Sequence, residues 1–301
     1  RAWRATSSIW WGVAPMIKLL SANFLRLRKT TLLWAALGVC VGLGALAAFG
    51  EFRVQLSMTS DMSTPGAAQY KSLLEGRFFE YAAFIGILAA AFISLFLGTE
   101  YSDGAIRNKV AVGHSRLSIY FAGLITGFAA SLLCMAGYML SCLAVGAPLL
   151  GWFTKPASLL LWAIFGSVVM LAAFCAIFTF VAMNCSRKAT SVVICLLGVF
   201  VLLIVTVVID GRLNAPEFIQ GYEMSFNGQV VNTVPEPNPR YLRGTERAVY
   251  QFLYDLLPTG QSLQYTMLNF TEPGKLMGLS GLVCAVFTGA GAALFRRKDL
   301  K

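Results

Sequence analysis

The sequence predicts an all-α integral membrane protein with six transmembrane helices. Its 301 residues are 57% hydrophobic and only 13% charged, whereas charged residues make up about a quarter of a typical soluble domain. Six stretches contain no Asp, Glu, Lys, Arg or His, and each is close to the ~20 residues that a helix needs to cross the hydrocarbon core. The predicted spans are 32–49, 81–98, 119–145, 159–183, 189–209 and 277–295.

The distribution of basic residues predicts the orientation of these spans. An even number of spans places both ends of the chain on one side. If that side is the inside, the inner segments hold 15 of the 24 Lys and Arg residues and only three acids, Glu100, Asp103 and Asp299. Because basic residues concentrate in cytoplasmic segments, we expect a multi-pass protein of the cell membrane with both termini in the cytoplasm. The net charge of +10 then reflects orientation and contact with lipid headgroups, with no nucleic acid partner.

The chain before the first span divides into two parts. Residues 1–15 precede Met16 and are expected to be a non-native or disordered extension, so that residues 16–301 form a single transmembrane domain. From Met16 to Lys29, Ile17, Phe24 and other apolar residues recur at helical spacing beside basic ones, which predicts an interfacial helix. The alternative is a secretory signal peptide, because a basic segment and an apolar run here precede a small-residue sequence that imitates a cleavage site.

A charged hinge of residues 98–120 separates the second and third spans. Ser102 or Asp103 can cap a short helix over 105–112, Gly113 can end it in a left-handed conformation, and Ser115 can cap the following span. The pattern therefore predicts helix, turn and helix on the cytoplasmic side. An ordinary cytoplasmic loop is the alternative.

The longest polar segment is the predicted outer loop 210–275, which is too long to be a bare connector. A turn at 226–229 lies between runs that favour β-structure, and 234–239 is a proline-rich break. Residues 246–257 have the spacing of an amphipathic helix on the outer surface or over a pore mouth. Its predicted lid residues are Phe252, Leu253, Leu256 and Pro258, and a simple lid without a role in substrate handling is the alternative.

Several kinds of chemistry have no residues to support them. The predicted spans lack the ionisable groups that ion-coupled carriers and intramembrane hydrolases require, and the nucleotide-binding sequence Gly-x-x-x-x-Gly-Lys-Ser/Thr does not occur. None of the seven cysteines falls in an outer loop or in a metal-binding spacing, so neither a disulfide framework nor a metal site is predicted. We therefore expect a non-catalytic chain without a cofactor, which depends on a partner for energy.

Three segments carry a resemblance to a known family. The hinge EYSDGAIRNKVAVGHSRLSIY, the outer segment YQFLYDLLPTGQ and the ending LFRRKDLK together resemble the type-2 permeases of ATP-binding-cassette (ABC) exporters. In that family the segment after span 2 is a coupling helix that docks on the ATPase, beside an amphipathic N-terminal helix. Ala105 stands where the family often has Thr. The resemblance implies that the coupling residues are Glu100, Tyr101, Ser102, Asp103, Gly104, Ile106, Arg107, Asn108 and Lys109.

The same resemblance implies an assembly. Six spans are half of what this class uses, which implies two permease chains, as a homodimer or a heterodimer, with two copies of a separate ATPase subunit that binds ATP and Mg. In the family spans 2 and 5 border the transport pathway, in a bacterial plasma membrane. The implied pathway residues are Phe84, Leu88, Phe92, Leu196, Phe200 and Leu203.

The spans without charge favour an amphipathic or hydrophobic cargo. The long loop between spans 5 and 6 is similar to that of exporters for amphipathic peptide toxins such as phenol-soluble modulins, so peptide export, toxin secretion or antimicrobial peptide resistance is expected, with drugs and lipids left open. An alternative of another class is a non-transporting sensor or immunity protein that binds a peptide through its outer loop. Such a protein needs no ATPase partner.

Overall fold

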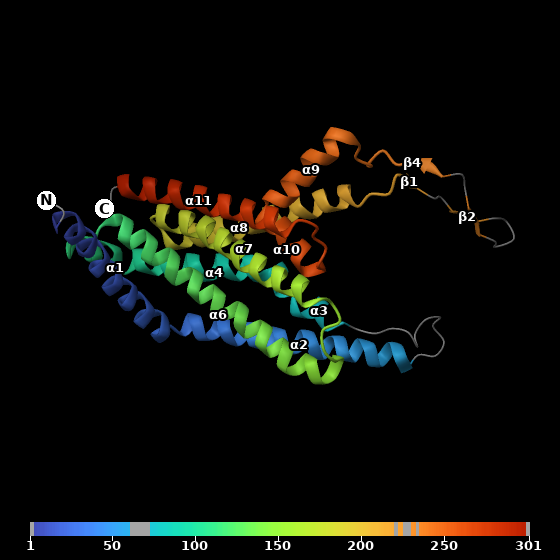
Figure 1. Ribbon diagram of the computed structural model, residues 1–301, viewed down its shortest axis with the longest axis horizontal. Helices are drawn as coiled ribbons and strands as arrows, with labels where there is room; N and C mark the ends of the chain where they lie inside the picture. Colours follow the sequence, from blue (N-terminus) through green and yellow to red (C-terminus); the bar gives the residue numbers. More distant parts are fainter. Residues whose placement is uncertain (1–2, 61–72, 220–221, 225–229, 233–234, 299–301) are drawn as a thin grey trace.

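The computed structural model describes residues 3–60, 73–219, 222–224, 230–232 and 235–298, and the side chains from residue 16 onward within these ranges, apart from residues 59–60, 222–224 and 230–232. The chain forms an elongated bundle of helices, with both ends of the chain at the same end of the bundle (Figure 1). Six helices are long and apolar enough to cross a membrane. The predicted class of a helical, multi-pass membrane protein is thereby confirmed.

Each of the six long helices contains one predicted span and extends beyond it. They are α2 (Thr31–Ser60), α4 (Tyr81–Ser102), α6 (Arg116–Leu150), α7 (Ala157–Asn184), α8 (Lys188–Leu213) and α11 (Pro273–Arg297). The apolar run marks only the part that fits hydrocarbon, whereas the helix itself continues until a residue breaks it. At the end of α6, for example, Gly151 adopts a φ of 90°.

Helix α4 is the central element of the bundle. It packs against α6, α7 and α8, while α2 packs mainly along α6 and α11 along α7. Residues of α4 from Tyr81 to Glu100 are therefore buried at most positions. Helix α8 instead turns a broad apolar side outward, where Leu197, Val201 and Ile204 are each more than half exposed.

Helix α1 (Trp3–Lys29) crosses the end of the bundle that holds both termini (Figure 1). It contains the predicted helix from Met16 to Lys29 and reaches back into residues 3–15, where we expected an extension outside the fold. Its packed side agrees with the expected apolar side only in part: Leu27 is buried beside Leu19 and Asn23, whereas Ile17 and Phe24 are 58% and 40% exposed. In a membrane protein the exposed apolar residues of such a helix can face lipid.

Short elements build the opposite end of the bundle. Helix α3 (Leu74–Phe78) precedes α4, and two antiparallel pairs follow α8: β1 (Phe218–Ile219) with β4 (Glu236–Pro237), and β2 (Tyr222–Met224) with β3 (Val230–Asn232). The pairing of β2 with β3 agrees with the predicted β-prone runs. The expected turn at 226–229 lies outside the described residues, and β4 forms within the predicted proline break.

The predicted outer helix is α9 (Gly244–Leu256), and it leads directly into α10 (Pro258–Met267). Helix α10 packs against α4, α7 and α8, so the chain turns back into the bundle after Pro258. Tyr265 of α10 is fully buried, and a Cβ at Gly166 of α7 would lie 2.3 Å from its hydroxyl oxygen. The glycine thus allows α10 to approach α7 closely.

Candidate functional site: the hinge between α4 and α6

The hinge begins with a turn that glycine makes possible. Helix α5 (Ala105–Ala111) has Gly104 at its N-cap position, in the left-handed region with a φ of 68°. The predicted caps do not form, because the Ser102 hydroxyl donates to the carbonyl of Thr99 and to the carboxylate of Asp103 instead. A left-handed conformation carries little penalty only for glycine, so the reversal after α4 depends on Gly104.

The end of α5 follows the prediction. Gly113 has a φ of 95°, its N–H donates to the Val110 carbonyl at 2.9 Å, and the His114 N–H donates to the Lys109 carbonyl at 3.1 Å. This pair of bonds is the Schellman arrangement that closes a helix on a left-handed residue. Ser115 then caps α6 by accepting a hydrogen bond from the Ser118 N–H at 3.1 Å.

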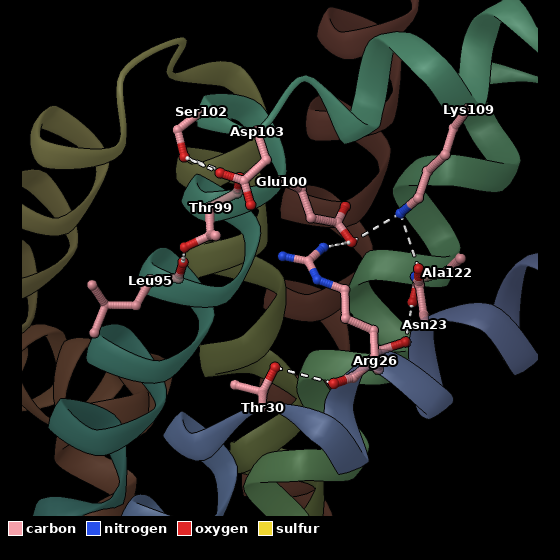
Figure 2. A network of polar contacts seen from close by, with 11 residues as sticks. Asn23, Arg26, Thr30, Leu95, Thr99, Glu100, Ser102, Asp103, Lys109 and Ala122 are labelled. Atoms are coloured by element: carbon pink, nitrogen blue, oxygen red, sulfur yellow. Dashed lines mark hydrogen bonds and ion pairs between the residues drawn. The ribbon is translucent and has the colours of Figure 1, made fainter.

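An ion cluster around one buried carboxylate joins α1, α4 and α5 (Figure 2). Glu100, at the end of α4, is fully buried, and its Oε1 accepts from Arg26 of α1 at 2.6 Å and from Lys109 of α5 at 2.8 Å. The Lys109 ammonium also donates to the Asn23 side-chain oxygen at 2.9 Å. One carboxylate therefore fixes the N-terminal helix and the hinge helix to the central span.

These contacts hold α1, α4 and α5 in one arrangement relative to one another. Removing one partner of a buried ion pair costs about 3–5 kcal/mol, because the other charge is left without compensation. The Arg26 guanidinium also lies over the ring of Phe96, 4.9 Å from its centroid, which adds a cation–π contact on the same side of α4. Displacement of α5 would therefore be transmitted to both α1 and α4.

The side of α5 that points away from the bundle carries exposed residues. Arg107 and Asn108 are exposed, as are Ser102 and Asp103 in the preceding turn, and Val112 is 78% exposed. No described residue forms an ion pair with Arg107. The nine predicted coupling residues thus divide into two sets: Glu100, Ile106 and Lys109 hold α5 on the bundle with half-buried Tyr101 and Gly104, and Ser102, Asp103, Arg107 and Asn108 present a polar surface.

A second set of contacts attaches the C-terminal segment to the hinge. The Tyr101 hydroxyl donates to the Met183 carbonyl, and the Lys298 ammonium lies 3.2 Å from both oxygens and 4.5 Å from the Tyr101 ring centroid. Arg116, at the start of α6, donates to the carbonyls of Arg296, at 3.0 Å, and Lys298. Burial lowers the pKa of Lys298 from its ordinary value. The ends of α4, α6, α7 and α11 therefore meet at one point.

Sequence reasoning missed four of the residues that build this site. Asn23, Arg26 and Lys298 contact the hinge from elsewhere in the chain, and Arg116 lies within the hinge and binds the C-terminal segment. Their only signal is a polar or basic residue close to a span end, which is equally typical of contact with lipid headgroups. The 74 residues between Arg26 and Glu100 leave no local pattern to detect.

The implied pathway residues occupy different environments. Phe92 is 5% exposed and stacks on Phe96 with ring centroids 5.8 Å apart, whereas Phe200 is 48% exposed on α8. Phe84, Leu88, Leu196 and Leu203 are partly buried against the core. Of the six, Phe200 alone is thus largely accessible to lipid or to a partner in the single chain, and the pathway role of all six stays a prediction.

The predicted lid residues also differ in burial. Phe252 and Leu253 are 50% and 40% exposed, Leu256 is half-buried, and Pro258 is buried at the start of α10. The apolar side of α9 therefore points away from the bundle over most of its length. The lid role of α9 stays a prediction.

Comparison with known proteins adds no identification. No protein-family model matches the chain, and no curated protein matches it significantly. Among the described residues, no three His, Cys, Asp or Glu side chains are grouped to hold a metal ion. The hinge thus presents an exposed polar surface on α5, which ion pairs to the buried Glu100 attach to the bundle.

Proposed function

We propose that this chain is the transmembrane subunit of an ATP-driven ABC exporter, and that α5 is the helix through which a separate ATPase moves it. The observation that carries the proposal is the division of α5 into two faces. Glu100 and Lys109 fix one face to the bundle, and Arg107 and Asn108 remain exposed on the other. A helix that is rigidly attached and freely accessible can transmit force from a partner to α4.

The same arrangement supports a two-state mechanism. ATP binding brings two ATPase subunits together, and their motion displaces α5 along with α1 and the end of α4. Contacts of Tyr101 and Lys298 extend that displacement to α7 and α11. Such a lever biases an equilibrium between two arrangements of the spans, one open to the inside and one open to the outside.

A second copy of the chain, or a related permease, completes the pathway in this proposal. The apolar side of α8 around Leu197 and Phe200 supports this assembly, because it offers a broad uncovered surface beside α4. The charge-free spans favour an amphipathic or hydrophobic cargo, and we propose peptides. The chain then lies in the plasma membrane with its hinge in the cytoplasm.

The test is co-purification with the ATPase encoded beside this chain, followed by ATP hydrolysis in nanodiscs with and without the permease. We expect a stable complex with altered hydrolysis, and we expect Arg107→Glu to reduce complex formation at least tenfold, since it reverses an exposed charge at the docking surface. Arg240→Glu is the matched control, because Arg240 is an exposed arginine near β4 at the other end of the bundle. An equal loss in both variants, or none in either, would refute the docking role.

The second candidate is a membrane protein that binds a peptide on its outer side without transporting it. A polar cavity beneath α9, lined by Asp255 and Lys275, favours it. The two functions separate cleanly in the same test: a peptide-binding protein of this kind forms no complex with the ATPase, and its hinge variants behave like the parent chain.

A further inference from the structure

Helix α9 has an apolar side and a polar side, and its apolar side is the exposed one. A helix that only covers a protein surface buries its apolar side, yet Val249, Phe252 and Leu253 are each 40% exposed or more. On the opposite side of the helix, Tyr254 and Asp255 are buried at 7% and 4% exposure. The side of α9 that faces the bundle therefore carries Tyr254, which packs in an apolar cluster with Ile209 and Leu213, and Asp255, and this side borders a cavity.

The cavity lies at the end of the bundle opposite the hinge, where α9 meets the ends of α8 and α10 and the start of α11 (Figure 1). Its volume is about 380 Å³, within the range of roughly 300–1,000 Å³ typical of small-ligand sites. Its charged lining residues are Asp210, Arg247, Asp255, Glu272 and Lys275. Met267, Phe270 and Leu276 add apolar surface to the wall.

Part of this charge is already compensated. The Asp255 carboxylate accepts from the Lys275 ammonium at 2.7 Å through Oδ2, and from the Gln251 and Gln264 amides at 2.9 and 3.2 Å through Oδ1. These contacts fix α9 against α10 and α11. Asp255 is thus a structural part of the wall, with both oxygens occupied.

The remaining charges are available to a ligand. Asp210 accepts from the Tyr254 hydroxyl at 2.8 Å and from the Asn214 amide at 3.1 Å, both through Oδ1. Glu272 and Arg247 form no ion pair with any described residue. Lys275 binds Asp255 and also lies within electrostatic range of Glu272. The charged lining as a whole has three carboxylates against one ammonium and one guanidinium, so the cavity carries a net negative charge.

We propose that this cavity binds a primary amine of a peptide, either a lysine side chain or the amino terminus, with the carboxylates of Glu272 and Asp210 as its acceptors. A lysine supplies both an ammonium group for the carboxylates and a hydrocarbon stem for the apolar wall. The choice of a peptide rests on the proposed function. Binding of the amine requires no ATPase, so the two proposals can fail separately.

The test uses the full chain in phosphatidylcholine nanodiscs without an ATPase. The probe is a fluorescent, C-terminally amidated 20-residue helix of Leu and Lys, and its binding is measured against empty nanodiscs. We expect Glu272→Gln to weaken binding at least fivefold and Arg247→Gln to strengthen it about threefold, since one change removes an acceptor and the other removes a repelling cation. Glu236→Gln, at an exposed acid of β4 outside the cavity, is the matched control and should leave binding unchanged.

Three further outcomes decide the assignment. A peptide with acetylated lysines and an acetylated amino terminus should lose the binding that depends on Glu272. Equal binding by the parent chain and all three variants would show that the probe binds elsewhere and would overturn the proposal. Binding of Ca²⁺ that Glu272→Gln abolishes, together with peptide binding that Glu272→Gln leaves unchanged, would identify a cation site instead and overturn the proposal. None of these results alters the test of ATPase docking at Arg107.

Discussion

Both ends of the bundle contain a buried carboxylate that binds a lysine, but the other charges are arranged differently at each end. At the hinge and beneath α9, a buried carboxylate accepts a lysine and further polar donors: Glu100 holds Lys109 and Arg26, and Asp255 holds Lys275. At the hinge the buried carboxylate is paired with two bases, and the charges without an ion pair, such as Arg107, lie on the exposed side of α5. At the other end Arg247 and Glu272 are exposed, line a cavity and form no ion pair with a described residue. The first arrangement suits a rigid lever, and the second suits a binding site.

The largest expected effect is the loss of Glu100. Glu100→Ala should lower the free energy of unfolding by about 3–5 kcal/mol, because it removes the fully buried carboxylate that pairs with two bases, of which Lys109 is only 16% exposed and Arg26 32% exposed. Denaturant or thermal unfolding in nanodiscs measures this. Asp103→Ala is the control on the same hinge, since Asp103 is exposed, and it should change the stability by less than about 0.5 kcal/mol. Equal losses of stability in the two variants would contradict the distinction between Glu100, which holds the helices together, and the exposed surface of the hinge.

The corresponding change at the other end should cost less. Asp255→Ala removes an acceptor from Lys275, Gln251 and Gln264, but the Lys275 side chain is 43% exposed and can turn to water. We expect a loss of about 1–3 kcal/mol. A cost equal to that of Glu100→Ala would mean that the cavity is as dry and rigid as the hinge, and it would weaken the assignment of a binding site.

The smallest expected effects come from the removal of two tyrosine hydroxyls, one at each end of the bundle. Tyr101→Phe removes the hydroxyl between Met183 and Lys298 and should cost about 0.5–1.5 kcal/mol, since both partners are part-buried. Tyr254→Phe removes the hydroxyl that donates to Asp210 beside the cavity. Water can replace that bond, so we expect a loss of less than about 0.5 kcal/mol. The reverse order of the two losses, measured by unfolding, would contradict the account.

The sequence predicted the elements of the fold better than their contacts. Charge-free runs located all six long helices, because the hydrocarbon core selects composition over a length that a window can detect. Gly113 and Ser115 were predicted correctly because helix ends depend on local backbone geometry. The cap at Gly104 was missed, since Ser102 and Asp103 fit the usual preference for polar caps.

Local sequence patterns could not predict which residues contact one another at the hinge and beneath α9. Helical spacing identified an apolar and a polar side of α9, yet it cannot tell which side faces inward, because lipid or a partner can cover an apolar side as readily as the core does. The same ambiguity applies to α1, where Leu27 of the predicted apolar side is buried but Ile17 and Phe24 are exposed and Asn23 is buried. Arg107 and Asn108 are exposed on α5, and their coupling role stays a prediction that comes from the resemblance to a family.

The most direct test of the account is site-specific photo-crosslinking at the hinge. A photo-reactive amino acid at Asn108 is illuminated in membranes that contain the chain and the ATPase encoded beside it, and Asn214, exposed at the other end of the bundle, serves as the matched position. The account predicts a crosslink to the ATPase from position 108, lost in Arg107→Glu, and none from position 214. A crosslink from neither position, or equally from both, would contradict the assignment of α5 as the docking helix.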